Sequence, residues 1–172
     1  MRFIEKAEND KRVRVLLKQL TRGAYSLDFD ELEKEAETLH ATRSIRHLKT
    51  KEVITDFQVK FIQAALQNQA YRSRMVEIKA KCFKVSAKLE EHLDVIKPYL
   101  RTKYAKSLSE FRTVADRNAA IERVLEKPIR HLQRLHNLDT LLEIYIKDFD
   151  QVSFGLKHII DAMKLTMDRK DI

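Results

Sequence analysis

The chain has 172 residues, a net charge of +8, 35% charged residues and 44% hydrophobic residues. This length suits one folding domain with its own core, and the surplus of Lys and Arg suggests a polyanionic partner. Two Gly and two Pro are too few for the turns of all-β and α/β folds or for a Gly-rich phosphate loop. We therefore expect an all-α fold.

Cysteine content and hydropathy indicate the compartment. Cys82 is the only cysteine, so an internal disulfide is excluded, and a free thiol suits a reducing cytoplasm. Charge interrupts the first twenty residues, which argues against a secretory signal. The longest uncharged run, Phe61–Tyr71, is too short to cross a bilayer. We expect a cytoplasmic protein without a membrane partner.

The N-terminal region carries its charge in blocks and predicts two short helices, over residues 3–21 and 28–40. Gly23 ends the first helix, and Asp28 is the expected N-cap of the second, whose acidic first turn suits the helix dipole. The acidic block at residues 28–37 either pairs with the basic segments around it or repels wrongly placed nucleic acid.

A seven-residue apolar repeat begins near residue 51 and continues for seven heptads. This 3.5-residue period is typical of a coiled-coil helix, which we expect over residues 51–98, with Pro98 ending or kinking it. Asn68 and His92 are the polar exceptions and are expected to set the register. One column is Ile54, Phe61, Asn68, Met75, Cys82, Leu89 and Ile96, and the second is Phe57, Ala64, Tyr71, Ile78, Val85, His92 and Tyr99.

A second long helix is expected over residues 114–167. Thr113 and Asp116 fit a capping box at its start, and Pro128 and Gly155 should bend it locally. The residues between the two long helices are expected to be partly helical. The resulting architecture is a long antiparallel helical hairpin over residues 46–172, preceded by short N-terminal helices over residues 1–45.

The second long helix carries one apolar column more than a two-helix seam needs. An apolar stripe this wide invites association if it is left in water. Either the N-terminal helices or another subunit must cover it, and the short N-terminal helices cannot cover it fully. We therefore expect a homo-oligomer. The expected oligomer interface comprises Leu125, Leu132, Ile146 and Ile160.

Lys and Arg gather in the first long helix and in the connector after it. Arg74, Lys81 and Lys88 repeat every seven residues along one flank. They could pair with acids across the seam, but the flanking columns of the second helix offer only Asp139 and Asp148. We therefore expect exposed positive charge suited to a flexible phosphate backbone. The expected nucleic-acid-binding residues are Arg72, Arg74, Lys79, Lys81, Lys84, Lys88, Lys97, Arg101, Lys103 and Lys106.

Residues that could carry catalysis or hold a metal form no recognisable pattern. None of the six His stands four residues from another, which excludes a zinc face of the HExxH type. Glu37 and His40 form a single ExxH pair, whereas a di-iron bundle needs two. Cys82 lies on the expected seam as a small core residue. We expect no enzyme, no metal site and no cofactor.

Three short segments have counterparts in a known family. They are Lys84-Val-Ser-Ala-Lys88, Ser109-Glu-Phe-Arg-Thr113 and Phe154-Gly-Leu-Lys-His-Ile-Ile-Asp161. These segments are similar to the basic helix, the connector and the C-terminal pattern of the bacteriophage UvsY-type recombination mediators. The resemblance extends over roughly residues 50–165.

This resemblance implies a non-enzymatic recombination and DNA-repair accessory protein. Such a mediator forms ring-like homo-oligomers, binds single-stranded DNA, and helps a recombinase displace single-strand-binding protein. Two other interpretations stay open: a coiled-coil assembly or scaffold protein without a nucleic-acid role, and a helix lying on a membrane surface. The lack of Trp and the apolar columns spaced for helix packing make the membrane interpretation weaker.

Overall fold

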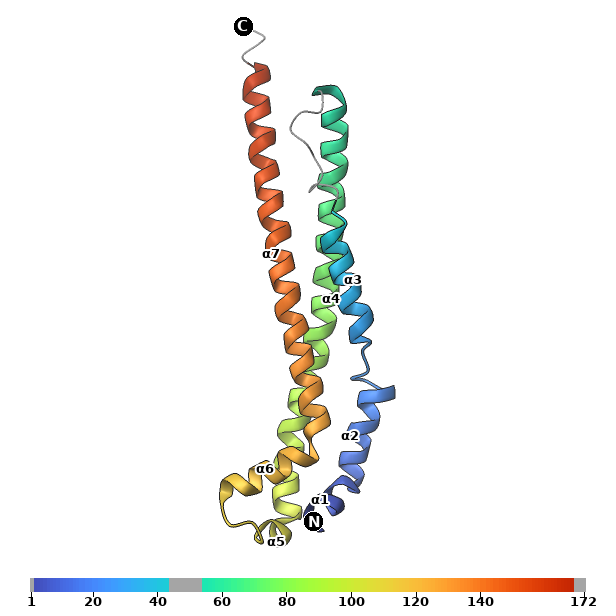
Figure 1. The fold of residues 1–172 in the computed structure, drawn as a ribbon, viewed down its shortest axis with the longest axis vertical. Helices are drawn as coiled ribbons and strands as arrows, with labels where there is room; N and C mark the ends of the chain where they lie inside the picture. The colour runs from blue at the N-terminus through green and yellow to red at the C-terminus, as the bar shows by residue number, and fades with distance from the viewer. Residues whose placement is uncertain (1, 44–53, 169–172) are drawn as a thin grey trace. The chain divides into compact units, whose positions relative to one another are not determined.

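The computed structural model describes residues 2–43 and 54–168, leaving aside the side chains of Arg2, residues 54–59, Ile160 and residues 162–168. Within these ranges every regular element is an α-helix and no strand occurs, which confirms the expected all-α class. Figure 1 traces the helices in chain order. They are α1 (Arg2–Glu8), α2 (Lys11–Arg22), α3 (Phe29–Ala41), α4 (Ile54–Lys103), α5 (Ala105–Leu108), α6 (Val114–Val124) and α7 (Glu126–Asp168).

The first long helix is present and extends further than expected. α4 contains 50 residues and continues through Pro98 to Lys103. Of the two outcomes expected at Pro98, an end or a kink of the helix, the end is therefore wrong. A proline removes one backbone hydrogen bond of a helix, but the apolar stripe continues past this point. Ile96 and Leu100 are both buried on either side of the exposed Pro98. Their packing therefore holds the last turns of α4 in place.

The second long helix is divided at Leu125, which corrects the single helix expected from residue 114. α6 ends at Val124, and α7 begins at Glu126 and contains 43 residues. Pro128 explains the break, because it has no N–H to donate to the carbonyl of Val124 and its ring crowds that carbonyl. Within α7 the same proline lies in the first turn, where no partner for its N–H is needed.

The start of α6 agrees with the sequence. The Thr113 hydroxyl accepts a hydrogen bond from the backbone N–H of Asp116 at 3.0 Å, and the Asp116 carboxylate accepts one from the N–H of Thr113 at 3.1 Å. This reciprocal pair confirms the capping box. The connector is also partly helical as expected, because it contains α5.

The N-terminal region contains one more helix break than expected. The single helix predicted over residues 3–21 is divided into α1 and α2 at Asp10, whose backbone is extended. The Asp10 carboxylate accepts a hydrogen bond from the Arg12 N–H at 2.8 Å and so caps α2. α3 begins directly after Asp28 and ends at Ala41, close to the expected helix.

The chain divides into two compact units. The first unit combines Met1–Asp28 with Lys81–Asp139, and the second combines Phe29–Ala80 with Thr140–Ile172. Each unit therefore contains N-terminal residues and part of both long helices. The expected domain boundary between residues 45 and 46 lies outside the described residues and stays a prediction.

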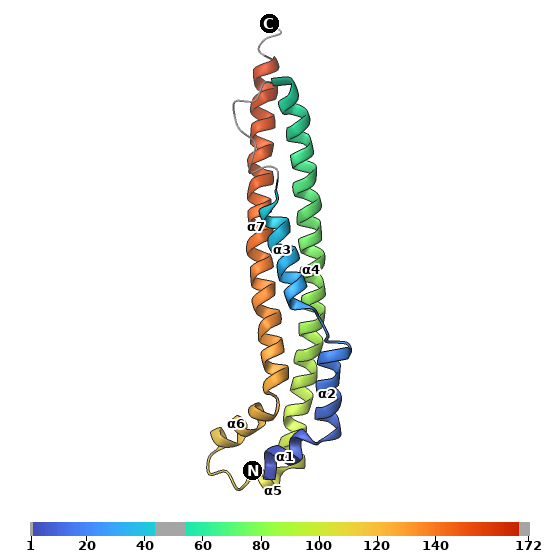
Figure 2. The ribbon, with the colours of Figure 1, turned by 45° about the vertical axis from the view of Figure 1, so that its right-hand side comes forward.

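The core of the first unit joins α2, α4 and α7. α2 lies beside the C-terminal part of α4 (Figure 2), and the Tyr25 hydroxyl is 3.1 Å from Nδ1 of His92. Glu90 of α4 pairs with His136 of α7 at 3.1 Å. The buried side chains include Val13, Leu16, Leu89, Ile96, Leu125, Leu135 and Leu138.

The second unit is organised around a buried amide. Asn68 is almost fully buried, and its Nδ2 donates to the carbonyl of Phe149 at 3.2 Å and to the Ser153 hydroxyl at 3.0 Å. Further along α4, Lys79 lies 3.7 Å from Glu143 of α7. A buried amide bonded to a specific carbonyl penalises any shift of one helix along the other. Asn68 thus has the geometry expected of a register-setting residue.

Buried Asp10 links the N-terminal helices to the end of α4. Its carboxylate accepts hydrogen bonds from Lys103 at 2.6 Å, Tyr104 at 3.0 Å and Tyr99 at 3.1 Å. Burial by itself raises the pKa of this carboxyl. The hydrogen bonds from Lys103, the Arg12 N–H and the two tyrosines outweigh burial and lower the pKa of Asp10 from 3.8 to about 2.

This cluster predicts a pH-dependent stability. Because the pKa of Asp10 in the folded state is below its ordinary value, the carboxylate stabilises the fold fully above about pH 4 and progressively less toward pH 2. Asp10→Asn should lower the free energy of unfolding at pH 7 by up to about 2 kcal/mol, since solvent screens the half-exposed Lys103. Urea unfolding at pH 7 and pH 3 measures the difference, which should shrink at pH 3.

Glu110→Gln is the matched control, because Glu110 is an exposed acid of the same unit. It should leave the free energy of unfolding unchanged at both pH values. A deficit of Asp10→Asn that is equally large at pH 7 and pH 3 would show that the carboxylate charge contributes nothing.

Candidate nucleic-acid interface

The expected basic residues in the second unit are neutralised by carboxylates. Arg72 donates two hydrogen bonds to Asp150, at 2.5 and 3.3 Å. Arg74 donates to Glu35 of α3 at 2.7 and 3.2 Å and to Glu77 at 3.0 Å. Both arginines have a raised pKa, chiefly because of these hydrogen bonds. The prediction that their charge stays unpaired is wrong.

Two further expected residues, Lys79 and Lys103, are also paired. Lys79 lies within ion-pair distance of Glu143, and Lys103 bonds to buried Asp10, which raises the pKa of the lysine. In the sequence, the columns that flank the expected seam offered only Asp139 and Asp148 as acidic partners for these cations. The acids that neutralise these cations come from other positions of α7 and from the N-terminal helices, which the seam columns do not include.

Five of the expected lysines have no carboxylate partner among the described residues, and three of them lie close together on α4. Lys81, Lys84 and Lys88, which we call the lysine row, are exposed and belong to α4 within the first unit. Their side chains make no ion pair or hydrogen bond with the part of the chain that the structure describes. Spacings of three and seven residues place them on one side of α4, along about 10 Å of helix. The lysine row is therefore a line of unneutralised positive charge.

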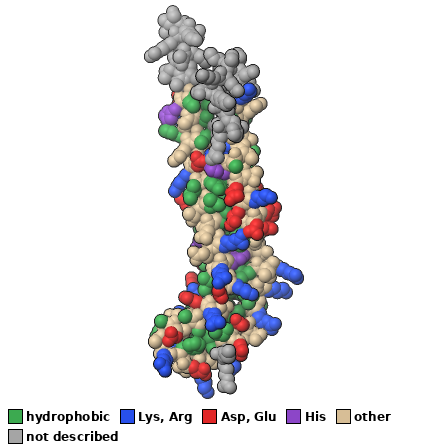
Figure 3. All heavy atoms as spheres, in the orientation of Figure 1, with side chains coloured by type: hydrophobic (Ala, Val, Ile, Leu, Met, Phe, Trp, Pro, Cys, Tyr) green, Lys and Arg blue, Asp and Glu red, His purple; other side chains and the backbone are tan. Residues whose placement is uncertain are grey.

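The packing of α4 explains why the lysine row faces solvent. Cys82 and Leu89, one position after Lys81 and Lys88, are buried. The nearby acid Glu77 already pairs with Arg74. The charge pattern elsewhere is mixed, since Lys and Arg lie beside Asp and Glu on the face drawn in Figure 3. What distinguishes the lysine row is the lack of paired acids rather than a large single-sign field.

Phe83 is an exposed aromatic residue of α4 that sequence reasoning missed, and it lies about 100° around the helix from Lys84, beside the lysine row rather than in it. Its side chain is 67% exposed, between Lys81 and Lys84 in the chain. It belongs to neither of the two apolar columns expected to form the seam. An aromatic residue outside both columns of a heptad pattern is the sequence signal that could have revealed it.

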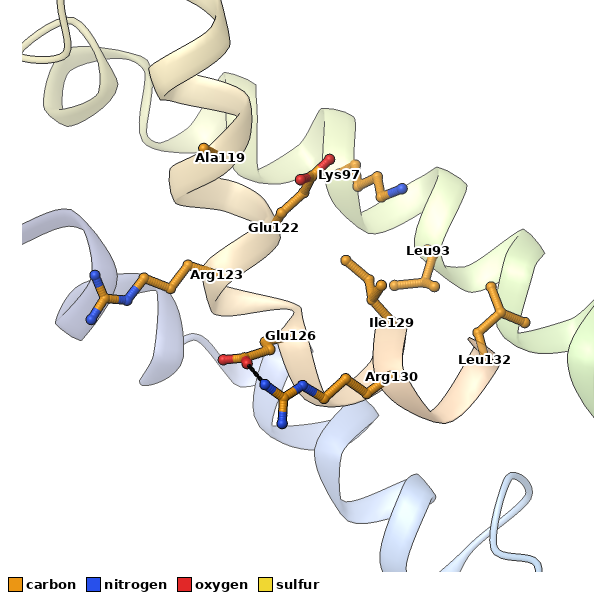
Figure 4. A pocket seen from close by; sticks show the side chains of 9 residues that line it. All are labelled: Leu93, Lys97, Ala119, Glu122, Arg123, Glu126, Ile129, Arg130 and Leu132. Carbon is orange, nitrogen blue, oxygen red and sulfur yellow. Dashed lines mark ion pairs between the residues drawn. The ribbon is translucent and has the colours of Figure 1, made fainter. Parts of the chain in front are cut away.

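The remaining expected cations, Lys97, Arg101 and Lys106, lie in the last turns of α4 and in α5 of the first unit. Lys97 lies at a pocket of about 640 Å³. Figure 4 shows the apolar side chains of Leu93, Ile129 and Leu132 close together there, and an ion pair between Glu126 and Arg130. The other lining residues are Ala119, Glu122 and Arg123. The charged residues of this pocket are Lys97, Glu122, Arg123, Glu126 and Arg130.

Arg101 and Lys106 have no carboxylate partner within the described residues. Arg101 donates to the Asn118 side-chain oxygen at 3.1 Å and lines a smaller pocket of about 330 Å³. Lys106 is exposed on α5. The structure therefore separates the ten expected cations into four paired ones and six without a carboxylate partner.

The four residues expected to form the oligomer interface differ in their burial. Leu125 is 0% exposed, because it packs in the core of the first unit, so its assignment to a subunit interface is wrong. Leu132 and Ile146 are half-buried. The side chain of Ile160 lies outside the described residues. Among the described side chains of α7 in the second unit, the exposed large apolar residues are Ile144, Phe154 and Ile159.

Metal-binding clusters and membrane-spanning helices are both lacking among the described residues. No group of three or more His, Cys, Asp or Glu side chains in that part of the chain could hold a metal ion. No described helix is both long and apolar enough to span a membrane. The strongest candidate surface is the lysine row, with exposed Phe83 on the neighbouring face of α4.

Comparison with other proteins adds no family to this picture. No protein-family model, curated protein or solved structure matches the chain. The likeness to UvsY-type mediators still depends on three short segments of sequence. The candidate interface itself depends on exposure, helical spacing and charge.

Proposed function

We propose that the chain binds single-stranded DNA through the lysine row and acts as a recombination mediator or accessory protein that helps to load a recombinase. The observation that supports DNA binding is the exposure of Lys81, Lys84 and Lys88 without a neutralising acid. The proposed partners, a recombinase and a single-strand-binding protein, and the proposed cytoplasmic location depend on the resemblance to the UvsY-type family. DNA binding and recombinase loading can therefore be tested separately.

The chemistry of the lysine row favours contacts to phosphates. A lysine ammonium is a compact charge without the fixed fork that arginine uses to recognise a base edge. Contacts to phosphates carry no sequence information and release counterions, so they make binding depend on salt. The expected activity is therefore DNA binding without strong sequence preference.

Exposed Phe83 favours a single strand over a duplex. Single-stranded DNA presents base faces, on which an aromatic side chain can stack, whereas a duplex hides them. Phe83 stands directly before Lys84 on α4 and is largely exposed. A strand that bends from the lysine row around α4 toward Phe83 would place one base on this ring.

Self-association would raise the affinity of such a small surface. The pairs Asn68–Phe149 and Lys79–Glu143 within the second unit fit the antiparallel hairpin expected from the sequence. Ile144 and Phe154 expose 58% and 65% of their surface on α7, and exposed apolar residues that gather on one helix favour association. Several copies would hold one strand by many weak contacts.

The alternative function is a coiled-coil scaffold without a nucleic-acid role. The same exposed Ile144 and Phe154 support it, because a scaffold needs an association surface. The lysine row would then be a solvated helix face. Salt-dependent binding of single-stranded DNA distinguishes the two functions.

The lysine row predicts a specific salt dependence. Lys81→Ala, Lys84→Ala and Lys88→Ala together remove three phosphate contacts and should reduce the slope of log K against log salt by about 2. Binding of a labelled oligo(dT) at several salt concentrations measures this slope. Ala is a good helix former at these exposed positions, so the helix content should be unchanged.

The matched control is the triple variant Lys18→Ala, Lys34→Ala and Lys157→Ala. These lysines are exposed, and the variant has the same net charge as the variant of the lysine row. It should keep most of the wild-type slope. Equal losses in both triple variants would contradict a localised site, and wild-type protein that ignores oligo(dT) at low salt would leave the scaffold function.

Phe83 gives an independent test of single-strand binding. Phe83→Ala should weaken oligo(dT) binding by about 1–3 kcal/mol if one base stacks on the ring, without a change of the salt slope. Val76→Ala, which also shortens an exposed apolar side chain of α4, should have little effect. Equal affinities of the Phe83 variant and the wild type would exclude stacking at this position.

The exposed apolar residues of α7 predict the association surface. Ile144→Ser with Phe154→Ser should shift the mass measured by light scattering toward the monomer, because each exposed side chain loses its apolar burial in the assembly. Val15→Ser, at an exposed apolar position of α2, is the control. An unchanged assembly mass with preserved helicity would place the association surface elsewhere.

A further inference from the structure

A second pocket of the first unit combines two arginines with an apolar wall. Its volume is about 330 Å³, and it lies where the end of α4, α5 and the start of α6 meet. The lining residues are Arg101, Ala105, Leu108, Val114, Arg117 and Asn118. Among the described residues, no carboxylate lines it. The pocket therefore has two positive charges and no internal counter-charge.

Each guanidinium is held in place by a neutral acceptor. One Nη of Arg101 donates to the Asn118 side-chain oxygen at 3.1 Å, and Nε of Arg117 donates to the carbonyl of Phe111 at 3.3 Å. Neither arginine makes an ion pair with the described part of the chain. In contrast, Arg72 and Arg74 of the second unit are occupied by carboxylates. Arg101 and Arg117 are thus oriented but not neutralised.

The nearest acid in the sequence does not neutralise this pair. Val114, Arg117 and Asn118 are spaced three and four residues apart and share one face of α6. Asp116 lies on another face, and its carboxylate accepts the N–H of Thr113 in the capping box. The capping hydrogen bond keeps the Asp116 carboxylate at the helix start.

We propose that this pocket binds a phosphate monoester, held by Arg101 and Arg117 with help from the Asn118 amide. A monoester carries close to two negative charges near neutral pH, which matches two guanidinium groups, whereas a phosphodiester inside a strand carries one. Guanidinium forks hold phosphate oxygens in fixed geometry. Leu108 and exposed Val114 provide apolar contact for the sugar or base attached to the phosphate.

The proposal goes beyond DNA binding by the lysine row, because a monoester pocket does not need that row. Two sources share the required chemistry: the 5′-terminal phosphate of a DNA strand and a free nucleoside monophosphate. The probes are oligo(dT) with a 5′-phosphate, the same oligo(dT) with a 5′-hydroxyl, and thymidine 5′-monophosphate. Their affinities for wild type and variants are measured by calorimetry at one salt concentration.

Wild-type protein should bind the 5′-phosphorylated oligo(dT) about tenfold more tightly than the 5′-hydroxyl form, the effect of one to two charge-assisted hydrogen bonds. Arg101→Gln and Arg117→Gln should each abolish this preference. Arg112→Gln, which removes an exposed arginine that does not line the pocket, should retain it. Arg101 is exposed, so Arg101→Gln should not affect folding. This variant alone can test the pocket if Arg117→Gln does not fold.

The outcomes separate this pocket from the proposed function. Preference for the phosphorylated strand without binding of the monophosphate supports the strand end as ligand. Arginine-dependent binding of the monophosphate by a protein that ignores both oligonucleotides supports the pocket and contradicts DNA binding. Equal affinity for both oligonucleotides together with no binding of the monophosphate overturns the pocket, as does an equal loss in Arg112→Gln.

Discussion

The buried apolar column of α4 is the constraint on which the rest of the structure depends. Met75, Cys82 and Leu89 follow one another every seven residues and are all buried. Their burial fixes the rotation of the helix, so the side chains on its other faces are directed to solvent or to the N-terminal helices. Lys81 and Lys88 face solvent because each stands directly before a buried residue of this column.

Carboxylates then decide which of the surface cations keep their charge available. Arg74 and Lys81 occupy equivalent positions one heptad apart, yet Arg74 bonds to Glu35 whereas Lys81 has no acidic partner in the described part of the chain. Exposed ion pairs stabilise a fold only weakly, but each one removes a cation from the set that an external polyanion can use. The acidic N-terminal helix α3 thus limits the extent of the basic surface.

The sequence predicted the helices that repeat regularly and the features that depend on near neighbours. The long periodic segments and the Thr113–Asp116 capping box are of this kind. Features that depend on tertiary contacts were missed. Pro98 stays within α4 because packing outweighs one lost hydrogen bond, and Glu35 pairs with a residue 39 positions away. Leu125 was also predicted wrongly. The additional apolar column of the second long helix indicated that Leu125 lies on an exposed stripe, but the helix breaks at this residue and its side chain is buried in the core.

The two candidate anion sites of the first unit differ in how their charges are held. The lysine row consists of flexible ammonium groups without fixed partners, which suits a polymer whose phosphates can shift along it. Arg101 and Arg117 are fixed by neutral acceptors beside apolar Leu108, which suits one ligand in one orientation. A strand that used both would be bound weakly along its length and specifically at one end. The free energy of end recognition would then not depend on base sequence, because neither site is arranged to contact a base edge.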